Sequence, residues 1–160
     1  MYKKIMVPLD GSEIAECVLS HVEAVAKSCR APVELVRVVE PIEIPTRGGL
    51  ALTSDDLKQI ELQAKQEAEV YLEGIAGRLS RAGLSAKSEV IIGKAADSLI
   101  DYARSTHADL IIMATHGRSG ISHWFWGSVA QRILHSSHIP VLLVRPPGCI
   151  PGVCDTSVSH

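Results

Sequence analysis

Glycines and a hydroxyl-bearing residue gather at two turns that follow the apolar run Leu110–Ala114. The first turn carries Gly117 and Gly120, and the second, Gly127-Ser128, directly precedes a helical pattern. Glycine lets a backbone approach a ligand closely, and the first amides of a helix bind anions. The two turns could therefore hold a di- or triphosphate from two sides. The alternative is that these glycines only turn a strand into a helix.

The familiar signatures of nucleotide chemistry are absent from the chain. There is no G-x-x-x-x-G-K-[ST], hence no P-loop lysine, and no G-x-G-x-x-G after the first strand. Gly117-Arg118-Ser119-Gly120-Ile121 is not a nucleophile elbow, because its closing glycine lies one position early. Histidines are scattered over a loop, a helix and a turn, at spacings that make no closed metal-ligand set: His116, His123, His135 and His138. We therefore expect neither a catalytic residue set nor a protein-only metal site.

The elements that position these turns alternate regularly along the chain. Strand-like segments fall at residues 4–9, 33–39, 86–92, 110–114 and 141–144. Helical spacing of apolar residues fills the gaps, at about 14–25, 55–81, 95–106 and 129–136, and a long irregular connection covers 41–56. This alternation predicts an α/β fold, a doubly wound parallel five-stranded sheet with helices on both faces. Ligands of such sheets bind beyond the carboxyl ends of the strands.

Composition excludes several classes of protein. The chain has 160 residues, with 16 basic against 18 acidic side chains, so it lacks the basic excess of a nucleic-acid binder. It has 46% hydrophobic residues but only 4% aromatic ones, which predicts one aliphatic core. We expect a single domain at residues 1–146 and a flexible tail at 147–160. No apolar run is long enough to span a membrane, no signal peptide is recognisable, and the four cysteines make no dense disulfide framework, so we expect a cytoplasmic protein.

Several segments closely resemble the universal stress protein family, in the right order and over nearly the whole chain from Tyr2 to about Arg145. They are Ile5-Met6-Val7-Pro8-Leu9-Asp10-Gly11-Ser12, Asp109 to Gly120, Gly127-Ser128-Val129-Ala130 and Ile139-Pro140-Val141-Leu142-Leu143-Val144. The resemblance implies a Rossmann-like, adenine nucleotide alpha hydrolase-like fold. The nucleotide-binding members of the family carry G-x2-G-x9-G-[ST], which here falls on Ala114, Gly117, Gly127 and Ser128.

Alanine thus stands at position 114 where the family pattern has its first glycine. Alanine adds one methyl group and disfavours positive φ. If residue 114 is extended and only passes close to the ribose, the change is mild. If the position requires positive φ, nucleotide binding suffers.

The resemblance implies an ATP site, with a divalent cation such as Mg²⁺ or Mn²⁺ bridging the phosphates. Pro8, Leu9 and Asp10 would lie against adenine and ribose, Val38 would pack on adenine, and Met113 would border the ribose. The phosphate turn would be lined by Ala114, His116, Gly117, Arg118, Ser119 and Gly120, and the helix start by Gly127, Ser128, Val129 and Ala130. The same residues have plainer interpretations: Asp10 or Ser12 can simply cap the first helix, and Arg118 can be a solvated loop cation.

Half of the aromatic residues are consecutive, as Trp124-Phe125-Trp126. They either cover the end of the last helix or contact a protein partner, where aromatic residues are enriched. The apolar strand Val141–Val144 is an expected edge strand that a second copy would protect, and members of the family commonly form such homodimers.

Three functions remain open at this stage. The first is a universal stress protein that binds an adenine nucleotide as a signal in a stress response. The second is a slow ATPase or phosphoryl-transfer enzyme using Arg118, His116 or Ser128. The third is a nucleotide-free protein-interaction dimer.

Overall fold

The computed structural model describes residues 1–41, 53–115, 127–146, 149–150 and 153–154. The elements of the main sheet and its helices follow in the order β1 (Ile5–Pro8), α1 (Glu13–Glu16), α2 (Leu19–Cys29), β2 (Val33–Val39), α3 (Ser54–Arg81), β3 (Ala86–Ile92), α4 (Ala95–Ser105), β4 (Leu110–Ala114), α5 (Ser128–Ser136) and β5 (Val141–Val144).

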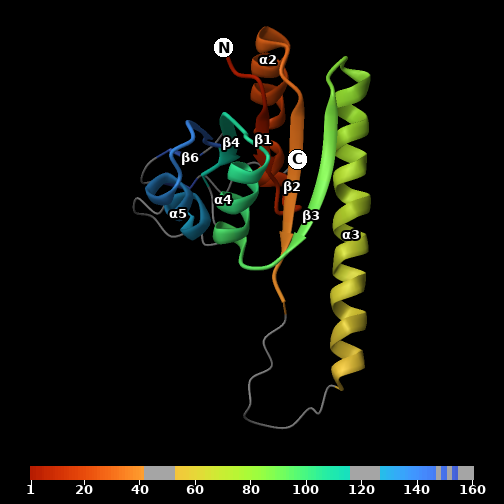
Figure 1. Cartoon of the computed structure of the whole chain (residues 1–160). Helices are drawn as coiled ribbons and strands as arrows, with labels where there is room; N and C mark the ends of the chain where they lie inside the picture. Colours follow the sequence, from red (N-terminus) through yellow and green to blue (C-terminus); the bar gives the residue numbers. More distant parts are fainter. Residues whose placement is uncertain (42–52, 116–126, 147–148, 151–152, 155–160) are drawn as a thin grey trace.

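The five strands form one parallel sheet in the order β3-β2-β1-β4-β5 (Figure 1). The chain builds the sheet outward from β1 in one direction through β2 and β3, then in the other through β4 and β5. The strand order therefore reverses between β1 and β4, which is where ligands of such sheets bind. The predicted fold class, a parallel five-stranded sheet with helices on both faces, is confirmed.

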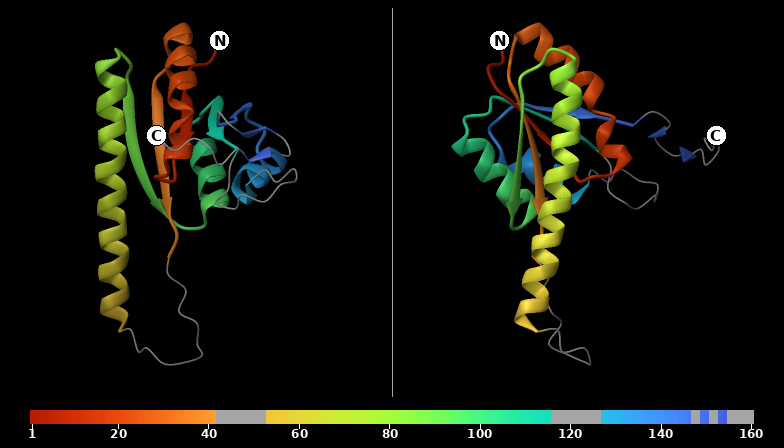
Figure 2. Two further views of the ribbon diagram at one scale, coloured as in Figure 1. Left: turned by 180° about the vertical axis from the view of Figure 1, so that it is seen from behind. Right: turned by 90° about the vertical axis from the view of Figure 1, so that its right-hand side faces the viewer.

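Helices cover both faces of the sheet (Figure 2). Alternate residues of each strand divide between two hydrophobic clusters, because successive side chains point to opposite faces. On β2, Leu35 packs with Leu72 of α3 in the cluster that includes α1 and α2. Val36 packs with Ile100 of α4 in the cluster that includes α5.

The longest helix, α3, begins at a capping box. The Thr53 hydroxyl accepts a hydrogen bond from the Asp56 amide at 3.2 Å, and the Asp56 carboxylate accepts one from the Thr53 amide at 2.9 Å. The helix ends just before Gly83, which adopts φ +85. The N-terminal turns of α3 extend beyond the ends of β2 and β3 (Figure 1), so Ile60 is 40% exposed although it keeps the helical spacing of the apolar residues.

Two other segments differ from the sequence-based expectation. The helix expected over 14–25 is two helices, because the Val18 amide bonds to Ala15, three residues back, in a tight turn between α1 and α2. Within 147–160, Cys149–Ile150 pairs with Val153–Cys154 in a short antiparallel ladder. The division into a domain at 1–146 and a flexible tail stays a prediction.

Some predictions lie outside the described residues. They include most of the connection 41–56, although α3 already begins at Ser54, and the whole of Trp124-Phe125-Trp126. Among the helices that the structure describes, none combines the length and apolar character needed to cross a membrane.

The packing of α3 on the sheet predicts a large cost for truncating Leu72, which is fully buried. We expect Leu72→Ala to lower the free energy of unfolding by about 2–5 kcal/mol, because it removes apolar contacts and leaves a cavity. Val70→Ala is the matched control: Val70 is on the same helix but 71% exposed, and we expect a change within about 0.5 kcal/mol. Urea unfolding of both variants measures the difference, and equal losses would contradict this packing.

Candidate functional site

A cavity of about 290 Å³ lies at the carboxyl ends of β1, β2 and β4, where the strand order reverses. Ten residues that the sequence predicts for the site line it: Pro8, Leu9, Asp10, Val38, Met113, Ala114, Gly127, Ser128, Val129 and Ala130. We call it the switch-point cavity. These residues come from three strands, the turn after β1 and the start of α5, so the sheet topology brings them together.

Four further residues line the switch-point cavity without having been predicted: Ala15, Val36, Ala95 and Leu99. Val36 lies two residues before Val38 on β2, and side chains at that spacing share one face of a strand. The two-residue period of the strand could therefore have predicted Val36 from Val38. Leu99 and Ala95 are one helical turn apart on α4. Their spacing in the sequence predicts that they face the core, but it does not predict that they line a cavity.

The other predicted site residues, His116, Gly117, Arg118, Ser119 and Gly120, lie outside the described residues. Their role in binding phosphate stays a prediction. The two ends of this segment are described: Thr115 follows β4, and the Gly127 amide donates to the Thr115 carbonyl at 3.5 Å. The start of α5 is therefore held close to the end of β4.

The structure answers the question that Ala114 raised. Ala114 is the last residue of β4 and pairs with Val144 of β5, so its backbone is extended. The non-glycine residues with positive φ in the described chain are Arg30 and His107. Alanine is thus compatible with the backbone at position 114, and the replacement of the family glycine adds only a methyl group beside the cavity.

The turn after β1 is built by its own side chains. The Asp10 carboxylate accepts hydrogen bonds from the amide and hydroxyl of Ser12, at 2.9 and 2.6 Å, and the Ser12 hydroxyl accepts one from the Ala15 amide at 3.1 Å. Ser12 is therefore the residue that caps α1, and Asp10 holds the cap in place. Only one Asp10 oxygen, Oδ1, takes part in these bonds, which leaves Oδ2 free of them.

Gly11, inside this turn, adopts φ +86. A Cβ at this position would lie 2.9 Å from the Arg37 guanidinium, which is the mobile end of a long side chain and could move aside, so it is the backbone conformation that favours glycine here. The Arg37 guanidinium also lies 5.4 Å from the centre of the Tyr71 ring, a cation–π distance. Arg37 thus links the turn beside the cavity to α3.

Tyr71 connects the same cluster to α1. Its hydroxyl donates to Glu16 at 3.3 Å, and Glu16 also pairs with Arg78 at 2.9 Å. Burial, followed by the negative charge of Glu16, raises the pKa of Tyr71 to about 12. These contacts fix α1, and with it the Asp10–Ser12 turn, against α3.

The backbone of β2 is open where it borders the switch-point cavity. The Val36 carbonyl accepts from the Leu9 amide, so the backbone groups of Val36 face β1. The Val39 carbonyl accepts from Gly93, which places the groups of Val39 on the β3 side. By the two-residue period of a strand, the amide and carbonyl of Val38 face the β1 side, beyond the last residue of β1 at Pro8. They are an adjacent donor and acceptor that none of the described strands pairs with on that side.

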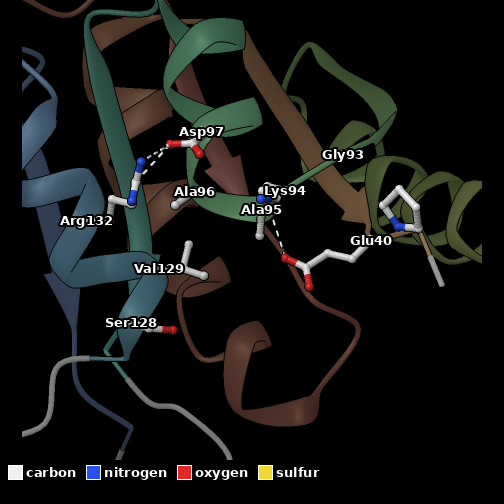
Figure 3. Close-up of a pocket in the computed structure, with 10 residues that line it drawn as sticks. Glu40, Gly93, Lys94, Ala95, Ala96, Asp97, Ser128, Val129 and Arg132 are labelled. Carbon is white, nitrogen blue, oxygen red and sulfur yellow. Dashed lines mark hydrogen bonds and ion pairs between the residues drawn. The ribbon is translucent and has the colours of Figure 1, made fainter. Parts of the chain in front are cut away.

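A second, larger cavity of about 600 Å³ adjoins the first. We call it the charged cavity, because Glu40, Lys94, Asp97 and Arg132 line it (Figure 3). Ala95, Ser128 and Val129 line both cavities and form their common wall. Within the described part of the chain, no cluster of three or more histidine, cysteine or acidic residues could hold a metal ion.

The sequence and the fold match one family of proteins. The family model described as the universal stress protein family matches residues 1–145. Universal stress proteins MJ0531 and MJ0577 of Methanocaldococcus jannaschii are each 31% identical to the chain, covering 92% and 91% of it and 84% and 96% of their own lengths. The chain belongs to the universal stress protein family.

Solved structures agree with this assignment. A structure of protein MJ0577 matches with a TM-score of 0.77 and 26% identity, covering 93% of this chain and 99% of that one. More distant structures share the fold, among them an Arabidopsis thaliana universal stress protein family protein with AMP bound (TM-score 0.60, 14% identity, covering 89% of this chain and 91% of that one). An Archaeoglobus fulgidus universal stress protein in complex with dAMP also has a TM-score of 0.60, with 21% identity and coverage of 89% and 97%.

The raised pKa of Tyr71 predicts a loss of stability at high pH. Below the ordinary tyrosine pKa of 10.0 the group is protonated in both the folded and the unfolded chain. Between 10.0 and about 12 the unfolded chain loses the proton first, so the free energy of unfolding falls. We expect Tyr71→Phe to decline less steeply than the wild type over this interval.

Urea unfolding of both proteins at several pH values from 9 to 12 makes this comparison. Burial also raises the pKa of Tyr102 to about 12. Tyr102 is present in both proteins, so its effect on the pH dependence of stability is the same in both and drops out of the comparison. Parallel declines would show that Tyr71 is not desolvated as described.

Proposed function

We propose that this universal stress protein binds an adenine nucleotide, ATP in the cell, and acts as a regulatory module in a stress response without rapid turnover of the nucleotide. The observation that carries the proposal is the convergence of ten predicted residues on the switch-point cavity. Cys17 and Cys29 are free thiols, which fits action in the cytoplasm.

The cavity suits a purine base. Val36, Leu99 and Met113 are at most 6% exposed and give it apolar walls. A base between them would be desolvated, so its polar edge needs partners. The amide and carbonyl of Val38, which none of the described strands pairs with on the β1 side, offer a donor beside an acceptor. Adenine presents a ring nitrogen that accepts and an adjacent amino group that donates, which is the complementary pair.

The remaining parts of a nucleotide also find matching groups. Asp10 lies at the cavity with an oxygen not used by the turn, and a carboxylate is a natural acceptor for a ribose hydroxyl. Gly127, the N-cap of α5, has no side chain to occupy the first amides of the helix. Ser128 and Val129 begin α5 at the cavity wall, so a phosphate at this wall would meet the first amides of the helix.

The relatives support the same ligand class. Structures with this fold are described as bound to AMP, dAMP and cAMP, all of which contain adenine. The part common to these ligands is adenine on a pentose that carries a phosphate, and a nucleoside of this size suits a cavity at the lower end of the usual range for ligand sites, about 300–1,000 Å³.

Filling the cavity should weaken nucleotide binding without unfolding the protein. We expect Val38→Phe to weaken binding of AMP and ATP by at least about tenfold, because the ring occupies the space of the base. Isothermal titration of nucleotide-stripped protein measures the affinities, and thermal unfolding checks that the variant is folded. Val70→Phe, on the exposed side of α3, is the control.

If Val38→Phe binds as tightly as the wild type, the base lies elsewhere. If the stripped wild-type protein binds neither nucleotide, with or without Mg²⁺, the proposal is wrong and a nucleotide-free interaction module takes its place.

We also propose a homodimer formed through β5. β5 is an edge strand of the sheet, its residues are all apolar, and Leu142 is 37% exposed. The opposite edge, β3, carries the charged Lys87 and Glu89, a common protection against strand pairing. The unprotected apolar edge is therefore the one that a second copy would cover.

Charge on the β5 edge should separate the two copies. We expect Leu142→Lys to shift the protein from dimer to monomer in sedimentation equilibrium, because two lysines would face each other across the pairing strands. Ile92→Lys is the matched control, since Ile92 is an apolar residue on the other edge strand and is 42% exposed. A dimer that survives Leu142→Lys, or a monomeric wild type, would contradict this interface.

A further inference from the structure

Two of the four cysteines are register partners in the short antiparallel ladder that follows the main sheet. The ladder joins β6 (Cys149–Ile150) to β7 (Val153–Cys154), and it places Cys149 directly opposite Cys154. The right-hand view of Figure 2 shows this ladder standing clear of the main sheet and its helices. A bond between the two cysteines would therefore leave the main fold unchanged.

The backbone at this pair has the separation that a disulfide needs. Hydrogen-bonded and non-hydrogen-bonded pairs alternate along an antiparallel ladder, and the turn of a two-residue hairpin bonds the pair next to it. That pair is Ile150 and Val153, so Cys149 and Cys154 form a non-hydrogen-bonded pair. The α-carbons of such a pair are about 4.5 Å apart, and disulfides join residues whose α-carbons are about 4.4–6.8 Å apart.

The ladder alone is too short to be stable. It has two residue pairs and forms a sheet of its own, and an isolated two-stranded hairpin is at best marginally stable in water. Its loop sequence, Pro151-Gly152, favours a type II turn, whose twist does not match that of paired strands. A covalent link across the ladder would therefore greatly increase the fraction of molecules in which the hairpin is formed.

The other two cysteines lack this arrangement. Cys17 caps the end of α1, Cys29 is the last residue of α2, and both are free thiols that pack against the hydrophobic core. Burial raises the pKa of the Cys17 thiol, which lowers its thiolate fraction and hence its reactivity toward oxidants. Cys149 and Cys154 are therefore the pair that we expect an oxidant to join first.

We propose that Cys149 and Cys154 are a redox modification site, at which a reversible disulfide fixes the hairpin of β6 and β7. The oxidant is a peroxide such as hydrogen peroxide. One cysteine thiolate attacks a peroxide oxygen, which gives a sulfenic acid and releases hydroxide, and the thiol of the other cysteine then displaces water to form the S–S bond. Two thiols are thereby oxidised to one disulfide, and one hydrogen peroxide is reduced to two waters.

A dithiol reductant reverses this reaction. Its thiolate attacks the disulfide to form a mixed disulfide, and its second thiol then releases the protein thiol, so both cysteines are restored and the reductant is oxidised. The cycle uses no residue of the switch-point cavity. It is therefore independent of nucleotide binding.

The test treats the reduced full-length protein with a stoichiometric amount of hydrogen peroxide and then blocks the remaining thiols with iodoacetamide in denaturant. We expect the thiols to fall from four per chain to two. Mass spectrometry should find Cys149 and Cys154 unblocked in one peptide that is two hydrogen atoms lighter than its reduced form, and dithiothreitol should restore all the thiols. The matched control, Cys17→Ser/Cys29→Ser, should lose both of its remaining thiols in the same way.

A second variant separates the effect of the register from closeness along the chain. Cys154→Ser/Asp155→Cys moves one thiol by one residue, and such a shift carries a side chain to the other face of a strand. We expect its disulfide to form at least about fivefold more slowly than that of the wild type, because its cysteines are not register partners. In the wild type, oxidation should slow hydrogen exchange at the Val153 amide by at least about tenfold, since the disulfide closes the hairpin.

The proposal is wrong if peroxide leaves all the thiols free, or if a non-reducing gel shows disulfides only between chains. It is equally wrong if the variant with the shifted cysteine oxidises as fast as the wild type, because the ladder would then not be what brings the cysteines together. An unchanged exchange rate at Val153 would contradict the claim that the disulfide fixes the hairpin.

Discussion

The candidate site depends on the early end of the central strand. β1 has four residues and ends at Pro8, which pairs with Val36, while β2 continues to Val39. The turn at Gly11 takes the chain away from the sheet, so among the described residues no strand pairs with the backbone of Val38 on the β1 side. Had β1 continued, its backbone would have paired with Val38 and closed the space. The cavity therefore exists because a middle strand is shorter than its neighbour.

Strand β2 separates the cavity, on one face of the sheet, from the contacts on the other face that hold the Asp10 turn in place. Val36 and Val38 face α4 and the cavity, whereas Leu35 and Arg37 face α2 and α3. Arg37 does not line the cavity, but its guanidinium lies against Gly11 and the Tyr71 ring. The turn that presents Asp10 to the ligand is thus held from the opposite face of the sheet.

Much of the fold and of the candidate site could be predicted from the sequence. The strands β2, β3, β4 and β5 have the predicted bounds, because each adjoins a glycine, a proline or a charged residue at one end at least. The tight turn between α1 and α2 could not be predicted, since apolar spacing continues through it. Ala114 could not be judged until its pairing with Val144 was known. The meeting of Arg132 with Asp97 depends on how α4 packs against α5, which spacing along the chain does not reveal.

The most direct test of the central claim is a titration of the methyl-labelled protein with AMP, followed by nuclear magnetic resonance. The account predicts that the methyl groups of Leu9, Val36, Val38, Leu99 and Met113 shift together at one stoichiometric equivalent, while those of Leu62 and Val70 on exposed turns of α3 do not. Shifts confined to other parts of the chain, or no shifts at saturating AMP, would contradict it.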